Sequence, residues 1–387
     1  MTTRKAITGA RIFDGTIWHD GAALIIADSK IGSVERATHL PSDAETIDAE
    51  GALIVPGFID LQVNGGGGVL LNEEPTAEGL RQICAAHAKF GTTALLPTLI
   101  TDTPEITAKT VAAGKQAKEQ GLPGFLGLHL EGPHLSVARK GAHDPTLIRP
   151  MEEKDIELIL TCRGEFEAMM ITIAPENVTV DQAGRLAQAG FTVSLGHTET
   201  SYETARTYAA AGARTVTHLF NAMSPLGHRE PGLVGAALDT GSLYAGLIAD
   251  GIHVHPASMQ VALHAKTGPG KIFIVTDAMS TIGTDLKSFT LNGREILRRY
   301  GRLTLADGTL AGADIDMISS VRFVHRTLGL PLEEALRMAS AYPAEAVHIS
   351  DRKGSLKAGY DADFVILTRD LGMKSTWIGG NKVYQNH

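Results

Sequence analysis

The sequence predicts an α/β protein: a (β/α)8 barrel of the TIM type with a small β-sandwich domain built from both termini. Through the middle of the chain, apolar strand-like runs alternate with amphipathic, alanine-rich stretches, as expected for a parallel sheet covered by helices. Eight such units in this length favour a closed barrel. The two ends of the chain instead contain short strands and turns without helical periodicity.

The composition is that of a soluble globular protein. Of its 387 residues, 43% are hydrophobic and 20% are charged, which is enough for a large domain and a smaller one. The formal net charge of -8 at pH 7 gives no indication of a nucleic-acid partner or an acidic membrane surface. An anionic substrate would therefore need a local positive site.

The cysteines and the chain start indicate a cytoplasmic protein. Cys84 and Cys162 form no CxxC pair, which favours two buried thiols, with a disulfide between them as the alternative. The first residues are polar and lead into a short strand rather than the apolar segment of a signal peptide. No apolar run is long enough to span a bilayer, so we expect no membrane partner.

The domain boundaries follow from a change in the predicted secondary structure along the chain. Residues 1–55 and 352–387 read as short strands separated by turns, and we assign both to the small β-sandwich domain. Residues 56–351 are assigned to the barrel. After its eighth strand, a β-hairpin excursion is predicted over 283–311, with turns at Asn292-Gly293 and Asp307-Gly308.

The barrel elements are predicted from continuous apolar runs and from helical spacing. An open doubly wound sheet is the alternative, but the glycines at 65–68 lack the spacing and the following helix of a dinucleotide-binding fingerprint. The predicted strands are 53–61, 92–99, 124–131, 169–175, 191–196, 215–220, 244–249 and 271–277. The predicted helices are 77–90, 104–118, 152–161, 180–189, 200–211, 256–266, 317–328 and 332–340.

Polar, titratable residues end five of these strands, where barrel enzymes carry their chemistry. Glu131 ends the third strand, and the Gly132-Pro133 turn that follows stops it. Any one such residue, taken alone, is more often a solvated loop or packing residue. Five titratable residues at the same end of the barrel are costly to bury together without a metal or a substrate. They are Glu131, His197, His218, His253 and Asp277.

One carboxylate and two imidazoles with an open fourth position are the ligand set of a catalytic zinc site. Glu131, His197 and His218 are the predicted ligands. Such an ion lowers the pKa of water toward neutrality, and Asp277 remains as a base for that proton. The alternative for Asp277 is a cap on a following helix, because aspartate favours that position.

Loops after the third and sixth strands carry further polar candidates. Lys140-Gly-Ala-His143 follows the third strand, and Asn221-Ala222 and the 228–232 loop follow the sixth. The planar guanidinium group of Arg229 is suited to bind a phosphate or a carboxylate through two parallel hydrogen bonds. Its alternative is a surface salt bridge with Glu230.

Taken in order, short stretches over essentially the whole chain resemble the amidohydrolase superfamily, and within it the N-acetylglucosamine-6-phosphate deacetylases. Each stretch alone is weakly specific, whereas the ordered set is strongly specific. The tail from Gly354 to Val365 resembles the strand pair that closes the small domain in this superfamily. The other matching stretches are 56–60, 130–133, 140–143, 196–198, 217–223, 229–233, 248–253, 275–277 and 308–310.

The resemblance implies a homodimeric enzyme that hydrolyses N-acetyl-D-glucosamine 6-phosphate to D-glucosamine 6-phosphate and acetate. It implies one divalent ion per subunit, Zn2+ before Fe2+, Mn2+ or Co2+, on Glu131, His197 and His218. Asp277 would perform the acid and base steps, and His143 would polarise the acetyl carbonyl. Some phosphate contacts would cross the dimer interface. The implied substrate-binding residues are Ala142, His143, Asn221, Ala222, Arg229, His253, Leu310, Ala311 and Gly312.

One departure from the superfamily concerns the metal count. Most members carry His-x-His after the first strand for a second ion, whereas this chain has Gln62-Val-Asn64, and amides are poor zinc ligands. Gln62, Asn64 and His129 are therefore expected beside the ligands rather than on an ion. Three alternatives stay open: another N-acetylated amino-sugar phosphate such as N-acetylgalactosamine 6-phosphate, a cyclic amide, and a non-catalytic scaffold with this fold. Arg229 and the 140–143 loop argue against a neutral cyclic amide.

Overall fold

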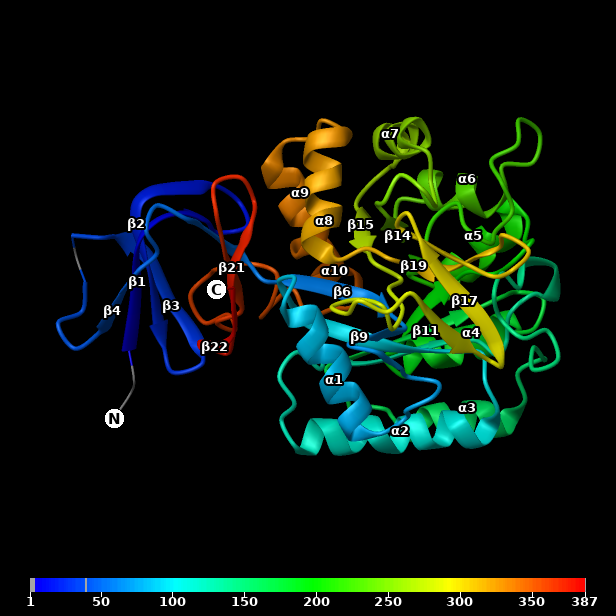
Figure 1. The fold of residues 1–387 in the computed structure, drawn as a ribbon. Helices are drawn as coiled ribbons and strands as arrows, with labels where there is room; N and C mark the ends of the chain where they lie inside the picture. Colours follow the sequence, from blue (N-terminus) through cyan, green and yellow to red (C-terminus); the bar gives the residue numbers. More distant parts are fainter. Residues whose placement is uncertain (1–3, 39, 387) are drawn as a thin grey trace.

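The computed structural model describes residues 4–38 and 40–386 and contains two eight-stranded sheets. Strands from both termini lie together on one side of the molecule, and the barrel with its helices lies on the other (Figure 1). In the described part of the chain, no helix combines the length and the apolar character needed to cross a membrane.

The barrel sheet has the strand order β15-β14-β13-β12-β11-β10-β9-β6, with parallel neighbours throughout. A parallel bridge between Val63 and Ala278 links its two end strands, so the barrel is nearly closed. All nine residues of β9 are buried, as expected for a strand covered on both faces. The strands are β6 (Phe58–Val63), β9 (Thr92–Ile100), β10 (Gly127–Glu131), β11 (Ala168–Ile173), β12 (Thr192–Leu195), β13 (Thr215–Val216), β14 (Tyr244–Ile248) and β15 (Ile272–Val275).

Most of the helices around the barrel have a side-chain cap at their N-terminus. The Thr103 hydroxyl accepts the Ile106 N–H ahead of Pro104, and Thr179 and Gln182 form a capping box. The helices are α1 (Ala77–Ala88), α2 (Pro104–Glu119), α3 (Glu153–Leu160), α4 (Val180–Gln188), α5 (Tyr202–Ala210), α6 (Gly232–Asp239), α7 (Pro256–Ala265), α8 (Met317–Arg322), α9 (Leu332–Ala339) and α10 (Ala341–Ala346), with a 3-10 turn η1 (Val137–Arg139) and a π-helical turn η2 (Phe323–Thr327).

The terminal sheet has the order β22-β21-β20-β5-β1-β2-β3, with β4 beside β1. Its core includes Ile7, Leu24 and Ile54, and the rings of Phe364 and Trp377 stack at 5.3 Å. The prediction that both termini build one small β region is confirmed. The strands are β1 (Arg4–Phe13), β2 (Trp18–Ala27), β3 (Lys30–Arg36), β4 (Glu45–Asp48), β5 (Leu53–Pro56), β20 (Phe364–Leu367), β21 (Met373–Ile378) and β22 (Asn381–Gln385).

Several predicted elements differ from the structure. The predicted strand 53–61 is wrong as one unit: β5 belongs to the terminal sheet and β6 to the barrel, and the chain changes sheet at Gly57. A Cβ at this glycine would lie 2.1 Å from the Thr93 hydroxyl, so the crossing requires glycine. The predicted helix 317–328 is divided between α8 and η2, and helices α6 and α10 were not predicted.

The predicted excursion after the eighth strand is a four-stranded antiparallel sheet rather than one hairpin. Its own small core includes Leu291, Ile296 and Leu303, packed against Met279 from the loop after β15. The strands are β16 (Ser288–Leu291), β17 (Arg294–Arg299), β18 (Arg302–Thr304) and β19 (Leu310–Ala313); a two-stranded hairpin, β7 (Gly65–Gly66) with β8 (Val69–Leu70), follows β6.

Candidate active site

A cavity of about 250 Å³ opens where the barrel strands end. Loops after the strands form most of its wall, and residues of the β16–β19 region complete it. Every predicted site residue except Gln62, His129 and Arg229 contributes to the lining. The predicted residues that line it are Asn64, Glu131, Ala142, His143, His197, His218, Asn221, Ala222, His253, Asp277, Leu310, Ala311 and Gly312.

Glu131, His197 and His218 form the tightest cluster in this cavity. Glu131 Oε1 lies 3.3 Å from His197 Nε2 and 3.2 Å from His218 Nε2, and the two nitrogens are 3.1 Å apart. A tetrahedral zinc ion about 2.0–2.1 Å from its ligands separates neighbouring donor atoms by about 3.3 Å. One carboxylate oxygen and two imidazole nitrogens at these separations therefore fit three corners of such a site.

The protonation of this cluster is set by burial and mutual contacts. Burial alone would raise the pKa of Glu131, but hydrogen bonds and charge from His197 and His218 hold it well below its usual range. Burial would lower the pKa of His218, and contact with the Glu131 carboxylate raises it instead. The carboxylate is thus ionised and available as a cation ligand.

Backbone conformation marks three of the predicted residues. His197, His218 and Asp277 have φ values of 48°, 25° and 52°, in the left-handed region that non-glycine residues rarely adopt. Strain of this kind is concentrated at functional sites, where the surrounding structure holds it in place. For His197, the surroundings include the Arg139 carbonyl, 2.8 Å from its Nδ1, and the Ser136 N–H, which donates to its carbonyl.

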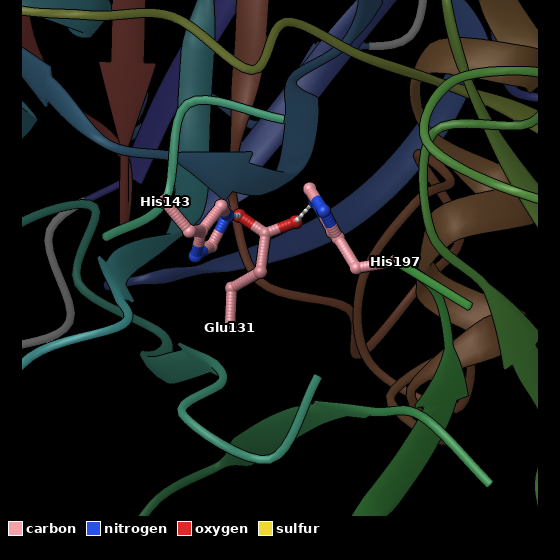
Figure 2. Close-up of side chains that lie close together, drawn as sticks. All are labelled: Glu131, His143 and His197. Atoms are coloured by element: carbon pink, nitrogen blue, oxygen red, sulfur yellow. Dashed lines mark ion pairs between the residues drawn. The ribbon is translucent and has the colours of Figure 1, made fainter. Parts of the chain in front are cut away.

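A third imidazole faces the same carboxylate. Figure 2 shows Glu131 between His143 and His197. His143 Nε2 is 3.9 Å from the second carboxylate oxygen, Glu131 Oε2, which is farther than either nitrogen of the tight cluster is from Oε1. Burial lowers the pKa of His143 to about 3, so its ring is neutral near pH 7.

Asp277 lies two residues beyond β15, opposite Glu131. Its Oδ1 accepts N–H groups from the Asn64 and Gln62 amides at 2.7 and 3.2 Å, and burial raises its pKa. The alternative that it caps a helix is wrong, because the next element is the strand β16. Gln62 Nε2 also lies 3.0 Å from Glu131 Oε1, so this one amide bridges the two carboxylates.

His129 lies deeper in the barrel than expected. Its ring nitrogens contact the hydroxyls of Thr98 and Thr172 at 3.2 and 2.7 Å, not the side chains of the tight cluster. Burial lowers its pKa to about 4, so it is a neutral part of the barrel interior. Its described hydrogen bonds do not reach Glu131, His197 or His218, and a place beside the predicted ligands stays a prediction.

Two residues at the site were not predicted. Asp250 Oδ2 lies 2.5 Å from His253 Nδ1, and its Oδ1 accepts the backbone N–H groups of Ile252 and His253, which fixes the ring at the cavity wall. The spacing Asp250-x-x-His253 was a signal for this contact. Thr101 contacts His143 across 42 residues of sequence, and no local pattern indicates it.

Arg229 does not lie in the cavity. Its side chain is exposed in the loop after β13, and among the described residues that line the cavity there is neither lysine nor arginine. The alternative of a salt bridge to Glu230 is not found among the described contacts, since Glu230 accepts the Tyr202 and Gly232 N–H groups. An anionic substrate therefore has no lysine or arginine to contact among the described residues of the cavity wall.

The chain belongs to the amidohydrolase family, whose model matches residues 53–383. Residues 6–54 match the NagA composite domain. The chain is 43% identical over 332 residues to the N-acetylgalactosamine-6-phosphate deacetylase of Shewanella sp. (strain ANA-3), covering 86% of this chain and 83% of that protein. It is 37% identical over 363 residues to the N-acetylglucosamine-6-phosphate deacetylase of Haemophilus influenzae, covering 92% and 93%.

Solved structures agree with these relatives. The crystal structure of N-acetylglucosamine-6-phosphate deacetylase from Pasteurella multocida superposes with a TM-score of 0.93 at 35% identity, covering 99% of this chain and 100% of that one. The predicted barrel with strands from both termini is confirmed by this similarity.

Proposed function

We propose that the protein hydrolyses N-acetyl-D-glucosamine 6-phosphate to D-glucosamine 6-phosphate and acetate. The observation that carries the proposal is the cluster of Glu131, His197 and His218 with Asp277 opposite, in one cavity of an amidohydrolase-family barrel. Relatives named as deacetylases of amino-sugar 6-phosphates support the substrate class. A phosphorylated sugar also fits a cytoplasmic enzyme.

The ligands of one divalent ion would be Glu131 Oε1, His197 Nε2 and His218 Nε2. Their mutual distances of 3.1 to 3.3 Å and the mixed oxygen and nitrogen donors fit a tetrahedral Zn2+ site, and we assign Zn2+ ahead of Fe2+, Mn2+ or Co2+. When bound, such an ion lowers the pKa of a water molecule and polarises a carbonyl group. The Gln62 and Asn64 amides already donate to Asp277, which supports a single ion rather than two.

Asp277 performs the proton transfers. The two amides occupy its Oδ1, which leaves Oδ2 to take a proton from the attacking water and deliver it to the departing sugar nitrogen. The raised pKa of Asp277 suits the first step, since a base of higher pKa accepts the proton more readily. His143 donates to the acetyl oxygen as negative charge develops there.

The sugar and its phosphate require further contacts. Asn221, Ala222, His253, Ala142 and the 310–312 segment surround the space left beside Asp277. We assign the phosphate to Arg229 of a second subunit in a homodimer, because Arg229 is exposed and the described residues that line the cavity include no lysine or arginine. Leu226, 53% exposed in the same loop, is suited to such an interface.

Arg229→Lys tests the phosphate assignment. A lysine ammonium cannot reproduce the two parallel hydrogen bonds of the arginine fork. We expect kcat/KM for the phosphorylated sugar to fall by about 10- to 100-fold, the scale of 1.4 to 3 kcal/mol lost from one charged contact. Hydrolysis of the unphosphorylated sugar should not change. An equal loss on both sugars would give Arg229 a structural role instead.

N-acetylgalactosamine 6-phosphate is a second candidate substrate, because a relative named for it is 43% identical to this chain. The two sugars differ only in the configuration of one hydroxyl group. Acetate release should be measured with both sugar phosphates, with unphosphorylated N-acetylglucosamine and with a cyclic amide. Higher kcat/KM for the galacto sugar would reassign the substrate, and no release from any of them would reject the deacetylase proposal.

A further inference from the structure

The position of the proton on His143 can be read from one contact. The backbone N–H of Thr101, the first residue after β9, donates to His143 Nδ1 at 3.3 Å, and the Thr101 hydroxyl lies 2.7 Å from the same nitrogen. A backbone N–H can only donate, so this nitrogen carries a lone pair and no proton. In the neutral ring the proton is therefore on Nε2.

This places an N–H donor in the cavity. His143 lines the cavity, and its Nε2 lies on the side of the ring that faces Glu131 Oε2. A protonated Nε2 has no lone pair for an ion. His197 has a different partner at Nδ1: the Arg139 carbonyl, which can only accept, lies 2.8 Å away, so this nitrogen carries a proton. The two rings, with centroids 4.4 Å apart, thus differ at Nδ1, which carries a proton in His197 and a lone pair in His143.

The glycine of the Glu131-Gly-Pro turn makes room for this contact. A Cβ on Gly132 would lie 2.2 Å from the Thr101 hydroxyl oxygen, closer than any real contact. Thr101 is only 1% exposed, so bulk solvent does not reach its hydroxyl. The turn that ends the Glu131 strand therefore also shapes the pocket that holds the hydroxyl against His143.

We propose that Thr101 is a positioning residue for the reaction: it holds His143 as the Nε2–H tautomer, so that this ring donates to the acetyl oxygen and does not ligate the ion. The role of the donor rests on the proposed deacetylation. The tautomer itself does not, because it follows from the hydrogen bonds to Nδ1.

The test compares three variants with the wild-type enzyme. Thr101→Val removes the hydroxyl at nearly constant volume, and Thr101→Ser restores it. Thr110→Val is the matched control, since Thr110 is also a fully buried threonine, but its hydroxyl donates to the Ile106 carbonyl within α2. Each sample is measured for metal content, kcat and KM, and for the 15N spectrum of its histidine rings, with the His143 signal assigned by its loss in His143→Gln.

We expect Thr101→Val to lower kcat by about 10-fold, part of the 100- to 1000-fold that one oxyanion donor supplies. KM and metal content should stay within about twofold. The Thr101 backbone N–H remains as a longer contact at 3.3 Å, so the His143 ring should become a mixture in which the Nε2–H tautomer no longer accounts for the whole signal. Thr101→Ser should recover both kcat and the spectrum, and Thr110→Val should change neither.

Three results would overturn the proposal: an unchanged tautomer in Thr101→Val, equal losses of kcat in the valine and serine variants, or loss of the ion together with kcat. If Thr101→Val does not fold, Thr101→Ala takes its place under the same criteria. Absence of acetate release from the wild-type enzyme would reject the deacetylase function, while the ring spectrum would still report on the tautomer.

Discussion

Two clusters of buried charge in this molecule are built in opposite ways. Near the terminal sheet, Asp361 accepts contacts from Lys30, Lys353 and Arg352 at 2.5 to 2.9 Å, and Lys353 also contacts Asp363. At the barrel mouth, Glu131 and Asp277 are buried with imidazoles and amides but without a lysine or arginine in the cavity lining. The first cluster is neutralised by lysine and arginine, whereas the Glu131 carboxylate of the second is faced by titratable imidazoles.

The pKa directions express this difference. Burial would raise the pKa of Asp361, but the charge of Lys353 and the hydrogen bonds of its partners lower it. Burial raises the pKa of Asp277, and the nearby Glu131 charge raises it further. A buried carboxylate pair whose partners are imidazoles and amides is costly when the imidazoles are neutral, which favours a cation or a substrate that completes it. The comparison therefore separates a structural cluster from a functional one.

The largest expected effect comes from His197→Ala. Removing one of three ligands should abolish both ion binding and acetate release, because the remaining carboxylate and imidazole are too few to retain the ion. Elemental analysis and turnover on the same sample measure this. The three proposed ligands predict one ion per subunit in the wild-type enzyme. Two ions at full occupancy would contradict the single-metal interpretation.

Asp277→Asn should separate ion binding from turnover. Asparagine keeps the shape of the side chain but cannot take a proton, so kcat should fall by roughly two to four powers of ten, the usual scale for a general base. The ion should remain, because Asp277 is not among the three proposed ligands. Near-normal turnover in a variant that retains its ion would show that Asp277 is not the base.

The sequence predicted this site because strand ends are visible as the points where apolar runs stop. Glu131, His197, His218 and Asp277 each follow such a run, and the barrel brings the strand ends to one face. Contacts set by the register between distant strands were not visible. Gln62 reaches Glu131 across 69 residues and Thr101 reaches His143 across 42, and no local periodicity encodes either contact.

The same limit explains the error in the fold. Residues 53–61 are apolar throughout, and an uninterrupted apolar run does not reveal that its two halves pair with different sheets. The change occurs at Gly57, where only the contact with Thr93 shows why glycine is needed. Arg229 was predicted correctly as a loop residue, but its distance from the cavity depends on loop geometry that the pattern does not contain.

Asp60 extends the comparison to a third carboxylate, and its expected effect is on stability. It is fully buried in β6, and burial raises its pKa to about 7 despite hydrogen bonds from Thr276 and the Gln62 N–H. The folded pKa is above the unfolded value of 3.8, so the stability that the neutral acid contributes is complete below that value. It is lost as the pH rises toward about 7.

Asp60→Asn should therefore be more stable than the wild type, by a margin that grows by about 2 to 3 kcal/mol between pH 5 and pH 8. Asparagine mimics the protonated acid and can keep the Thr276 contact. Urea unfolding of both proteins at several pH values, with the ion present, measures the difference. A margin that does not change with pH would show that Asp60 is ionised in the folded protein over this whole range.

The smallest effect is expected in the neutralised cluster. Asp361→Asn removes the carboxylate that three cationic side chains contact. Lys353 still has its ion pair with Asp363 at 2.6 Å, and the cluster is partly open to solvent. Screening limits the loss to about 1 to 2 kcal/mol of unfolding free energy, below the cost of breaking a fully buried pair. Because the folded pKa of Asp361 is lowered, its contribution is present above the unfolded pKa of 3.8 and is lost as the pH falls below it.

Turnover and ion content should not change in Asp361→Asn, because this cluster is complete without any ligand. Glu167→Gln is the matched control: Glu167 contacts Arg352 at 3.4 Å with 40% of its side chain exposed, so its loss should cost under about 0.5 kcal/mol. If Asp361→Asn lowered kcat while the protein remained folded and loaded with its ion, the two clusters would be coupled. The division into a structural and a functional cluster would then be wrong.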